Sequence, residues 1–126
     1  MVLVDTSVWV SHLRETHDGL VDLLNNAEVV CHPFIIGELA CGNLKSRTSI
    51  ITLLEALPMA LVVDHEELRS FIENRKVMGK GLGYVDVHLL AAALLTGVSI
   101  WTFDKKLDKV AEELHCNFKK SRITRR

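Results

Sequence analysis

The stretch Val2-Leu3-Val4-Asp5-Thr6-Ser7 passes directly from an apolar run to an acid and then to two hydroxyl side chains. This order is typical of a short buried strand that leads into a helix, because Thr6 and Ser7 are good N-terminal caps. The spacing predicts that the helix continues through Leu13. Asp5 is therefore expected at the carboxyl end of a strand.

The rest of the chain repeats this alternation of short apolar strands and helices. No hairpin signal such as Asn-Gly joins the strands, so the pattern favours a parallel sheet covered by helices on both faces. Further strands are predicted at residues 29–32 (ended by Pro33), 60–63 and 99–102. Helices are predicted at residues 18–25, 34–44, 49–57, 65–78 and 86–96, with a last amphipathic helix near 107–114.

Length and composition indicate one domain over residues 1–126. A chain of 126 residues with 48% hydrophobic residues has enough apolar surface for a core. The longest apolar run, residues 89–95, is far shorter than a bilayer span, and the N-terminus lacks the basic region of a signal peptide. We therefore expect a cytoplasmic protein with no membrane partner.

Cysteine and histidine spacing excludes two other classes of site. The three cysteines form no CxxC pair, and the histidines form no HxxxH pair. Neither a disulfide framework nor a zinc site is expected. Net charge is −1, but residues 105–126 carry eight Lys or Arg against three acids, a net charge of +5. The basic tail at about 117–126 is equally compatible with an RNA contact and with a solvated chain end.

Four acids occupy comparable places in this pattern, because each lies where a strand gives way to a helix or one turn inside such a helix. They are Asp5, Glu38, Asp86 and Asp104. In an open α/β sheet the strand ends converge on one crevice, so these acids are expected to share a site. Taken singly, each aspartate has an ordinary explanation as a helix cap.

Glu38 has no such explanation as a cap. Its helical neighbours are apolar or small (Phe34, Ile35, Cys41 and Gly42), and an ionised group in such a stripe costs several kcal/mol unless something offsets it. Two carboxylates ~4 Å apart also repel by about 4 kcal/mol at an effective dielectric constant near 20. A divalent cation that prefers oxygen ligands, Mg²⁺ or Mn²⁺, would remove both costs.

Several residues near these acids have two readings each. Thr6, Ser7 and Thr102 are candidates for supporting the metal ligands, although caps and strand ends use the same residues. Asp108 is expected to pair with Lys105 or another surface base, with a role behind the ligands as the alternative. Other neighbours are expected to be structural: His88, Trp9 and Trp101.

The segments that carry the acids resemble PIN-domain ribonucleases, and more narrowly the VapC toxins of bacterial toxin-antitoxin systems. The likeness covers nearly the whole chain, in the family's order and spacing. The matching segments are Val-Asp-Thr-Ser-Val-Trp at 4–9, Phe-Ile-Ile-Gly-Glu-Leu-Ala at 34–40, Gly-Lys-Gly-Leu-Gly-Tyr-Val-Asp-Val-His-Leu-Leu-Ala at 79–91 and Trp-Thr-Phe-Asp-Lys-Lys-Leu at 101–107.

The resemblance implies an α/β protein with a three-layer α/β/α fold and a central, mostly parallel sheet. It implies a Mg²⁺-dependent endoribonuclease, with Mn²⁺ as a substitute, in which a metal-activated water cleaves RNA to leave 5′-phosphate and 3′-hydroxyl ends. Asp5, Asp86 and Asp104 would hold the metal, and Glu38 would orient the water or complete the shell. Phe103 departs from the family, where a basic residue is common before the last acid.

The resemblance also implies partners. A cognate antitoxin would cover the cleft, and the toxin would form a homodimer within the toxin-antitoxin complex. The RNA itself and the residues that bind it are not identified by the sequence, because transfer, ribosomal and messenger RNA all fit a cleft that recognises phosphates and single-stranded bases.

Two other functions remain open at this level. A phosphatase that forms an aspartyl-phosphate, like the haloacid dehalogenases, also has an aspartate after its first strand, but its second aspartate is Ser7 here. A non-catalytic PIN-fold module that binds RNA or protein is the other alternative. Such a module is expected to lack part of the acidic quartet, and all four acids are present.

Overall fold

The computed structural model describes residues 1–119, and three short strands form its sheet. These are β1 (Val2–Val4), β2 (Val29–Val30) and β3 (Ser99–Trp101). The strand order is β2-β1-β3, and both neighbours of β1 run parallel to it. The part of the predicted basic tail from residue 120 onward lies outside the described residues.

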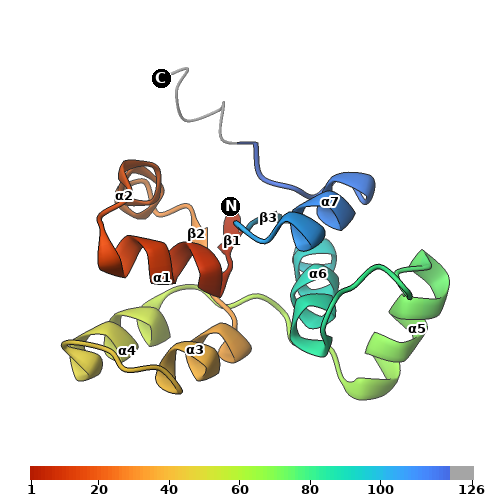
Figure 1. Ribbon diagram of the computed structural model, residues 1–126, viewed down its shortest axis with the longest axis horizontal. Coiled ribbons are helices and arrows are strands. Elements are labelled where there is room, and N and C mark those ends of the chain that lie inside the picture. The colour runs from red at the N-terminus through yellow and green to blue at the C-terminus, as the bar shows by residue number, and fades with distance from the viewer. Residues whose placement is uncertain (120–126) are drawn as a thin grey trace.

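Helices account for most of the described residues. Their bounds are α1 Thr6–Arg14, α2 Asp18–Asn25, α3 Pro33–Ala40, α4 Arg47–Ala56, α5 His65–Arg75, α6 Tyr84–Thr96 and α7 Lys105–Glu113. In Figure 1 the helices α4 and α5 lie farthest from the strands, at opposite ends of the molecule. None of the helices in residues 1–119 is long and apolar enough to cross a membrane.

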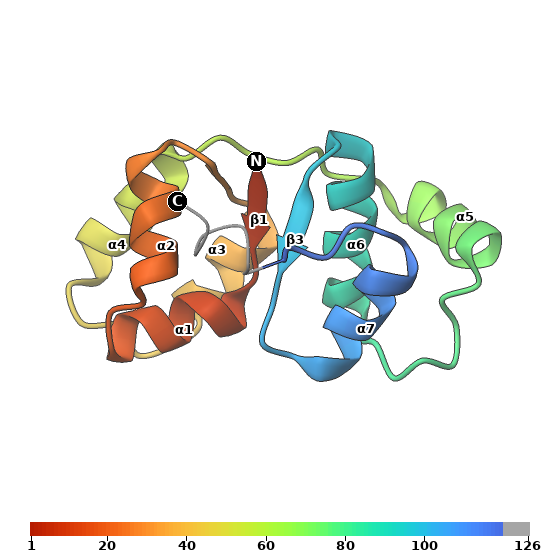
Figure 2. The same ribbon diagram turned by 90° about the horizontal axis from the view of Figure 1, so that it is seen from above.

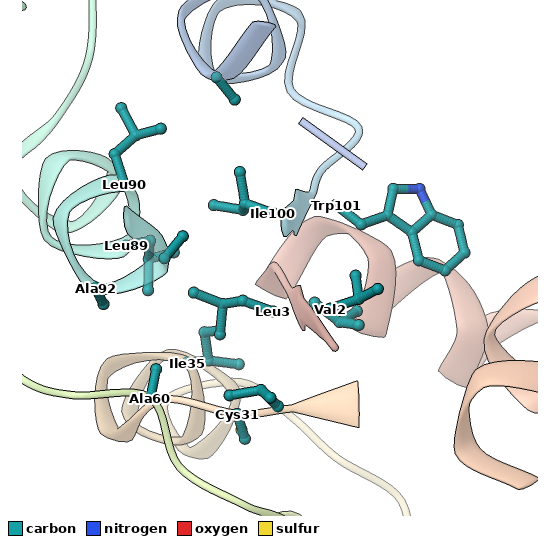
Figure 3. Packing of buried hydrophobic residues seen from close by; sticks show 14 of the residues in the cluster. Val2, Leu3, Cys31, Ile35, Ala60, Leu89, Leu90, Ala92, Ile100 and Trp101 are labelled. Carbon is teal, nitrogen blue, oxygen red and sulfur yellow. The ribbon is translucent and has the colours of Figure 1, made fainter. Parts of the chain in front are cut away.

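The strands carry core side chains on both faces because successive residues of a strand alternate in direction. Figure 3 shows Leu3 and Ile100 directed toward Leu89 of α6, while Val2 and Trp101 are directed to the opposite side. The ring of Trp101 contacts that of His17, the N-cap residue of α2, with ring centroids 5.1 Å apart. Helices therefore cover both faces of the sheet, which confirms the expected three-layer α/β/α fold.

The parallel arrangement gathers several helix starts at one edge of the sheet. Figure 2 shows the first residues of α1, α6 and α7 at the edge where β1 and β3 end. Asp5 directly follows β1, and Asp104 directly precedes α7. The fold thus places acids that are far apart in sequence at a common edge, as expected for parallel strands.

The strand predicted at residues 60–63 is wrong. The chain pairs with the sheet only through an isolated bridge between Met59 and Cys31. Beyond it, the backbone N–H of Leu61 donates to Thr96 Oγ1 at 3.0 Å, and the side chains of Leu61 and Val62 are more than half exposed. The segment is apolar enough for a strand but has no continuous backbone partner among residues 1–119.

Two helices end earlier than predicted. Hydrophobic periodicity does not reveal the side-chain contact or the backbone conformation that ends each of them. Helix α3 ends at Ala40 and not at residue 44. At this end the Arg47 guanidinium donates to the carbonyl oxygens of Ala40 at 2.6 Å and of Gly42 at 3.3 Å. Helix α5 ends at Arg75 and not at 78, because Lys76 adopts a left-handed conformation with φ of 53°.

The start of α3 depends on a buried histidine. Pro33 occupies the first helical position, where its missing N–H costs nothing. His32 is fully buried, and its Nδ1 accepts a hydrogen bond from the backbone N–H of Phe34 at 3.0 Å. Its Nε2 has no hydrogen-bond partner among residues 1–119. Because Nδ1 is an acceptor, the cap requires the neutral form of His32.

Candidate active site

Asp5 occupies the N-cap position of α1, and only 6% of its surface is exposed. Its Oδ2 accepts hydrogen bonds from Thr102 Oγ1 at 2.7 Å and from Ser7 Oγ at 2.9 Å. Thr102 follows β3, and Ser7 lies in α1. The carboxylate is therefore oriented from two elements, and its Oδ1 stays outside these bonds.

The same two hydroxyls connect Asp5 to the segment that carries Asp104. Thr102 Oγ1 accepts a hydrogen bond from the backbone N–H of Asp104 at 3.0 Å. Ser7 Oγ accepts one from the backbone N–H of Phe103, also at 3.0 Å. Thr102 and Ser7 thus fix how the end of β3 sits beside Asp5, which is a positioning role.

Backbone donors hold one oxygen of each of the other two aspartates. Asp104 caps α7 through Oδ1, which accepts from the N–H of Lys106 at 2.9 Å and of Leu107 at 3.1 Å. Asp86, in the first turn of α6, accepts from the N–H of Gly83 through Oδ2 at 3.2 Å. The ordinary capping role is real, yet it uses a single oxygen of each carboxylate.

Asp86 is the point at which the four acids act on one another. Burial raises the pKa of the half-buried Asp86 carboxyl, and the negative charges of Asp5, Asp104 and Glu38 raise it further, while the Gly83 hydrogen bond opposes them. The structure thus brings all four predicted acids into one electrostatic environment. Uncompensated negative charge in a partly desolvated site attracts a cation.

Glu38 differs from its expected setting. The side chain is exposed, so the burial cost that its apolar neighbours suggested does not arise. Its Oε1 accepts a hydrogen bond from Thr6 Oγ1 at 2.7 Å, which ties α3 to the start of α1. A cavity of about 630 Å³ opens beside this pair, lined also by Val10, Leu13 and Leu44. Glu38 therefore lines a cavity next to Thr6, the residue that follows buried Asp5.

Two neighbouring residues do not join the site. Asp108 is half-buried, and within residues 1–119 it forms no ion pair, so its expected pairing with a surface base is wrong. Burial, with a contribution from Glu112, raises the pKa of Asp108. His88 is buried between Phe34 and Tyr84, with ring centroids at 4.7 and 4.6 Å.

The donor set fits a hard divalent cation. All four candidates are carboxylates, and oxygen ligands are those that Mg²⁺ and Mn²⁺ prefer. Within residues 1–119, none of the four acids forms an ion pair with a Lys or Arg. As they stand, the acids of this part are not close enough to form a ready-made metal cage. Waters would complete the coordination, as is usual for Mg²⁺.

Comparison with known proteins identifies the family. The sequence matches the PIN domain over residues 2–113, which is most of the chain. The protein belongs to the PIN-domain family. The PIN domain is also 45% identical, over 114 residues, to ribonuclease VapC32 from two strains of Mycobacterium tuberculosis, and the match covers 90% of this chain and 92% of each relative. The expected resemblance to VapC-type PIN ribonucleases is confirmed.

The PIN fold is also seen in a solved structure of low sequence identity. PAE2754 from Pyrobaculum aerophilum superimposes with a TM-score of 0.61 at 17% identity, covering 99% of this chain and 90% of that one. This likeness supports the architecture of the PIN domain alone. The family match also removes the support for an aspartyl-phosphate phosphatase, whose second aspartate is already replaced by Ser7.

Proposed function

We propose that this protein is a Mg²⁺- or Mn²⁺-dependent endoribonuclease and the toxin of a type II toxin-antitoxin system. The observation that carries the proposal is the gathering of the aspartates: buried Asp5 shares the Thr102 hydroxyl with the backbone of Asp104, and the charges of Asp5, Asp104 and Glu38 act on half-buried Asp86. The 45% identity to a ribonuclease over most of both chains supports RNA as the substrate. The nuclease is proposed to be one domain, residues 1–126.

The roles follow from how each acid is held. Asp5 and Asp86 are the principal metal ligands, because each is fixed by hydrogen bonds and partly withdrawn from water. Asp104 completes the ligand set with the oxygen that does not cap α7. Exposed Glu38, steadied by Thr6, orients the attacking water. A cation held by these residues would lower the pKa of a nearby water and stabilise negative charge on the phosphate.

Purified protein without antitoxin, incubated with total cellular RNA, tests this function. We expect cuts in Mg²⁺ that disappear when EDTA removes the metal. RNA that is bound but never cut, across transfer, ribosomal and messenger RNA, would contradict the nuclease and favour the non-catalytic module. Catalysis of the same cuts in EDTA would contradict the metal dependence alone.

Metal binding is expected to stabilise the protein. A ligand at 100 times its dissociation constant adds about 2.7 kcal/mol to the free energy of unfolding. Thermal melting with increasing Mg²⁺ should therefore show a rising midpoint in the wild type and little change in Asp86→Asn, which lacks one ligand charge. A K⁺ titration at matched ionic strength separates specific binding from screening. Identical midpoints with and without Mg²⁺ would argue against the site.

Thr102→Val tests the positioning of Asp5. The change keeps the side-chain shape but removes the hydroxyl that donates to Asp5 and accepts from the Asp104 N–H. Loss of such an outer partner typically costs about 10- to 100-fold in metal affinity or activity. Cleavage rates and Mg²⁺ affinity measured against the exposed-helix control Thr52→Val check it. Equal activity of both variants would show that the hydroxyl does not position Asp5.

We propose two protein partners, a cognate antitoxin and a second copy of the chain in a homodimer. The cavity beside Glu38 is the place that suits an antitoxin, because it combines apolar walls with charged side chains of both signs, Glu38 against Arg14 and Lys45. A basic antitoxin side chain placed there would offset the charge of the acids and exclude RNA.

A further inference from the structure

A second cluster of charged side chains lies beside the acids and has the opposite sign. Lys106, Lys109 and Glu113 follow one face of α7 at spacings of three and four residues, and Lys80 reaches the same place from the loop before α6. Together with Val110 they line a pocket of about 250 Å³. We call these residues the lysine pocket.

The lysine pocket carries an excess of positive charge. Lys80 Nζ pairs with Glu113 Oε1 at 2.9 Å, and this pairing lowers the pKa of Glu113. Lys106 and Lys109 form no ion pair within residues 1–119. Two unpaired ammonium groups in one small pocket repel each other, and an anion that enters it relieves the repulsion.

The lysine pocket is joined directly to the acidic site. The backbone N–H of Lys106 donates to Asp104 Oδ1, and the Lys106 side chain lies on the glycine loop before α6: a Cβ built on Gly81 would stand 3.0 Å from Lys106 Cδ and 3.3 Å from its Nζ. Gly83 in the same loop donates to Asp86. Lys106 therefore bridges the two segments that present Asp104 and Asp86.

An acidic nuclease site has a physical problem that this pocket solves. Four carboxylates repel the phosphates of an approaching RNA, and a cation in the site offsets only the charge at the cut. The neighbouring phosphates need positive charge of their own. Lysine is a suitable partner because its ammonium group is a compact point charge on a flexible stem, able to follow a single strand without reading its bases.

We propose that Lys106 and Lys109 bind a backbone phosphate next to the cleaved one, while Glu113 holds Lys80 at the pocket wall. This inference rests on the proposed function, because it names how the same RNA is held. It also gives a role to Lys106, which the sequence did not single out. The Lys106 ammonium group offsets the negative charge of an RNA phosphate where the strand enters or leaves the acidic cleft.

RNA binding as a function of salt tests the pocket. We use a labelled single-stranded oligouridine RNA, Mg²⁺ and an Asp5→Asn parent, so that binding is measured without cleavage. Each lost phosphate contact reduces the magnitude of the slope of log affinity against log salt by about 0.7 for a single strand, so Lys106→Gln with Lys109→Gln, which removes the one phosphate contact, should reduce it by about 0.7. Lys76→Gln, an exposed lysine at the end of α5, should leave the slope unchanged.

The outcomes separate this inference from the proposed function. If the wild type cleaves RNA but the double substitution leaves the salt slope of the Asp5→Asn parent unchanged, phosphate binding by the lysine pocket alone is overturned. A protein that binds RNA with the expected slopes but never cleaves it overturns the nuclease alone. Absence of any RNA binding overturns both.

A matched pair of glycine substitutions tests the placement of Lys106. Gly79 and Gly81 both have positive φ, 70° and 77°, so Ala at either position carries a similar backbone strain. A Cβ at 79 meets nothing within 4 Å, whereas one at 81 stands 3.0 Å from Lys106 Cδ, so the lysine side chain must move away from it. Gly81→Ala should reduce the magnitude of the salt slope, by at most about 0.7, and Gly79→Ala should not. Equal slopes in the two variants would overturn the placement.

Discussion

Asp86→Asn and Asp5→Asn are each expected to lower RNA cleavage by more than about 100-fold without unfolding the protein. The loss exceeds the roughly 10- to 100-fold typical of an outer partner, because a proposed metal ligand itself is removed. Folding should survive because neutralising Asp86 removes the cost of burying its charge and the repulsion from the other acids, the two effects that raise its pKa. Initial cleavage rates at saturating Mg²⁺, with circular dichroism and thermal melting, measure both effects.

The matched control is Asp22→Asn, which removes the charge of an exposed acid on α2. It should cleave RNA like the wild type. Folded Asp86→Asn protein with wild-type activity would contradict the assignment of the site, as would an equal loss in Asp22→Asn. A metal-free Asp86→Asn protein less stable than the wild type would contradict the electrostatic account of the site.

Stability is expected to fall steeply in mild acid because of His32. Burial, aided by the charge of His88, lowers the pKa of His32 from 6.5 to about 4. The unfolded chain therefore binds a proton between pH 6.5 and 4 that the folded protein does not, so the free energy of unfolding falls as pH drops through this window. The full loss, about 3 kcal/mol, is present below pH 4. Protonation would also place a hydrogen on His32 Nδ1. This hydrogen would point at the Phe34 N–H and break the hydrogen bond that Nδ1 accepts from it.

Urea unfolding across this pH range, in wild type and His32→Asn, measures the effect. Asn does not titrate there and still caps a helix, so the variant should lose part of the acid sensitivity, although its smaller side chain lowers stability at pH 7. His115→Asn, at an exposed position with positive φ that suits Asn, is the control and should keep the wild-type profile. An unchanged slope in His32→Asn would contradict the prediction.

The sequence places the acids well because their positions follow from local rules. Asp5 and Asp104 adjoin strand ends, and parallel strands must bring those ends to one edge. Asp86 follows a glycine run that starts a helix. The apolar stripe around Glu38 predicts a costly buried carboxylate, but the side chain is exposed, so burial does not single out Glu38 as a ligand. The resemblance to PIN domains is what supported it.

What the sequence did not show depends on contacts between distant segments. Residues 60–63 have strand-like composition, but whether a strand forms is decided by a backbone partner that is absent from the described residues. The end of α3 is held by Arg47 from the next helix. The role proposed for Lys106 depends on Gly81, which is far away in sequence but lies against the Lys106 side chain. The spacing of lysines on α7 was visible, but not the loop that turns it into a pocket.

The most direct test of a metal-dependent ribonuclease at the four acids is the chemistry of the cut ends. Total RNA is cleaved by antitoxin-free protein in Mg²⁺, with EDTA and Asp5→Asn controls, and both ends are sequenced with their end groups. Attack by water at the acidic site predicts 5′-phosphate and 3′-hydroxyl ends that vanish in both controls. Ends bearing a 2′,3′-cyclic phosphate, or cuts that persist in Asp5→Asn, would contradict the account.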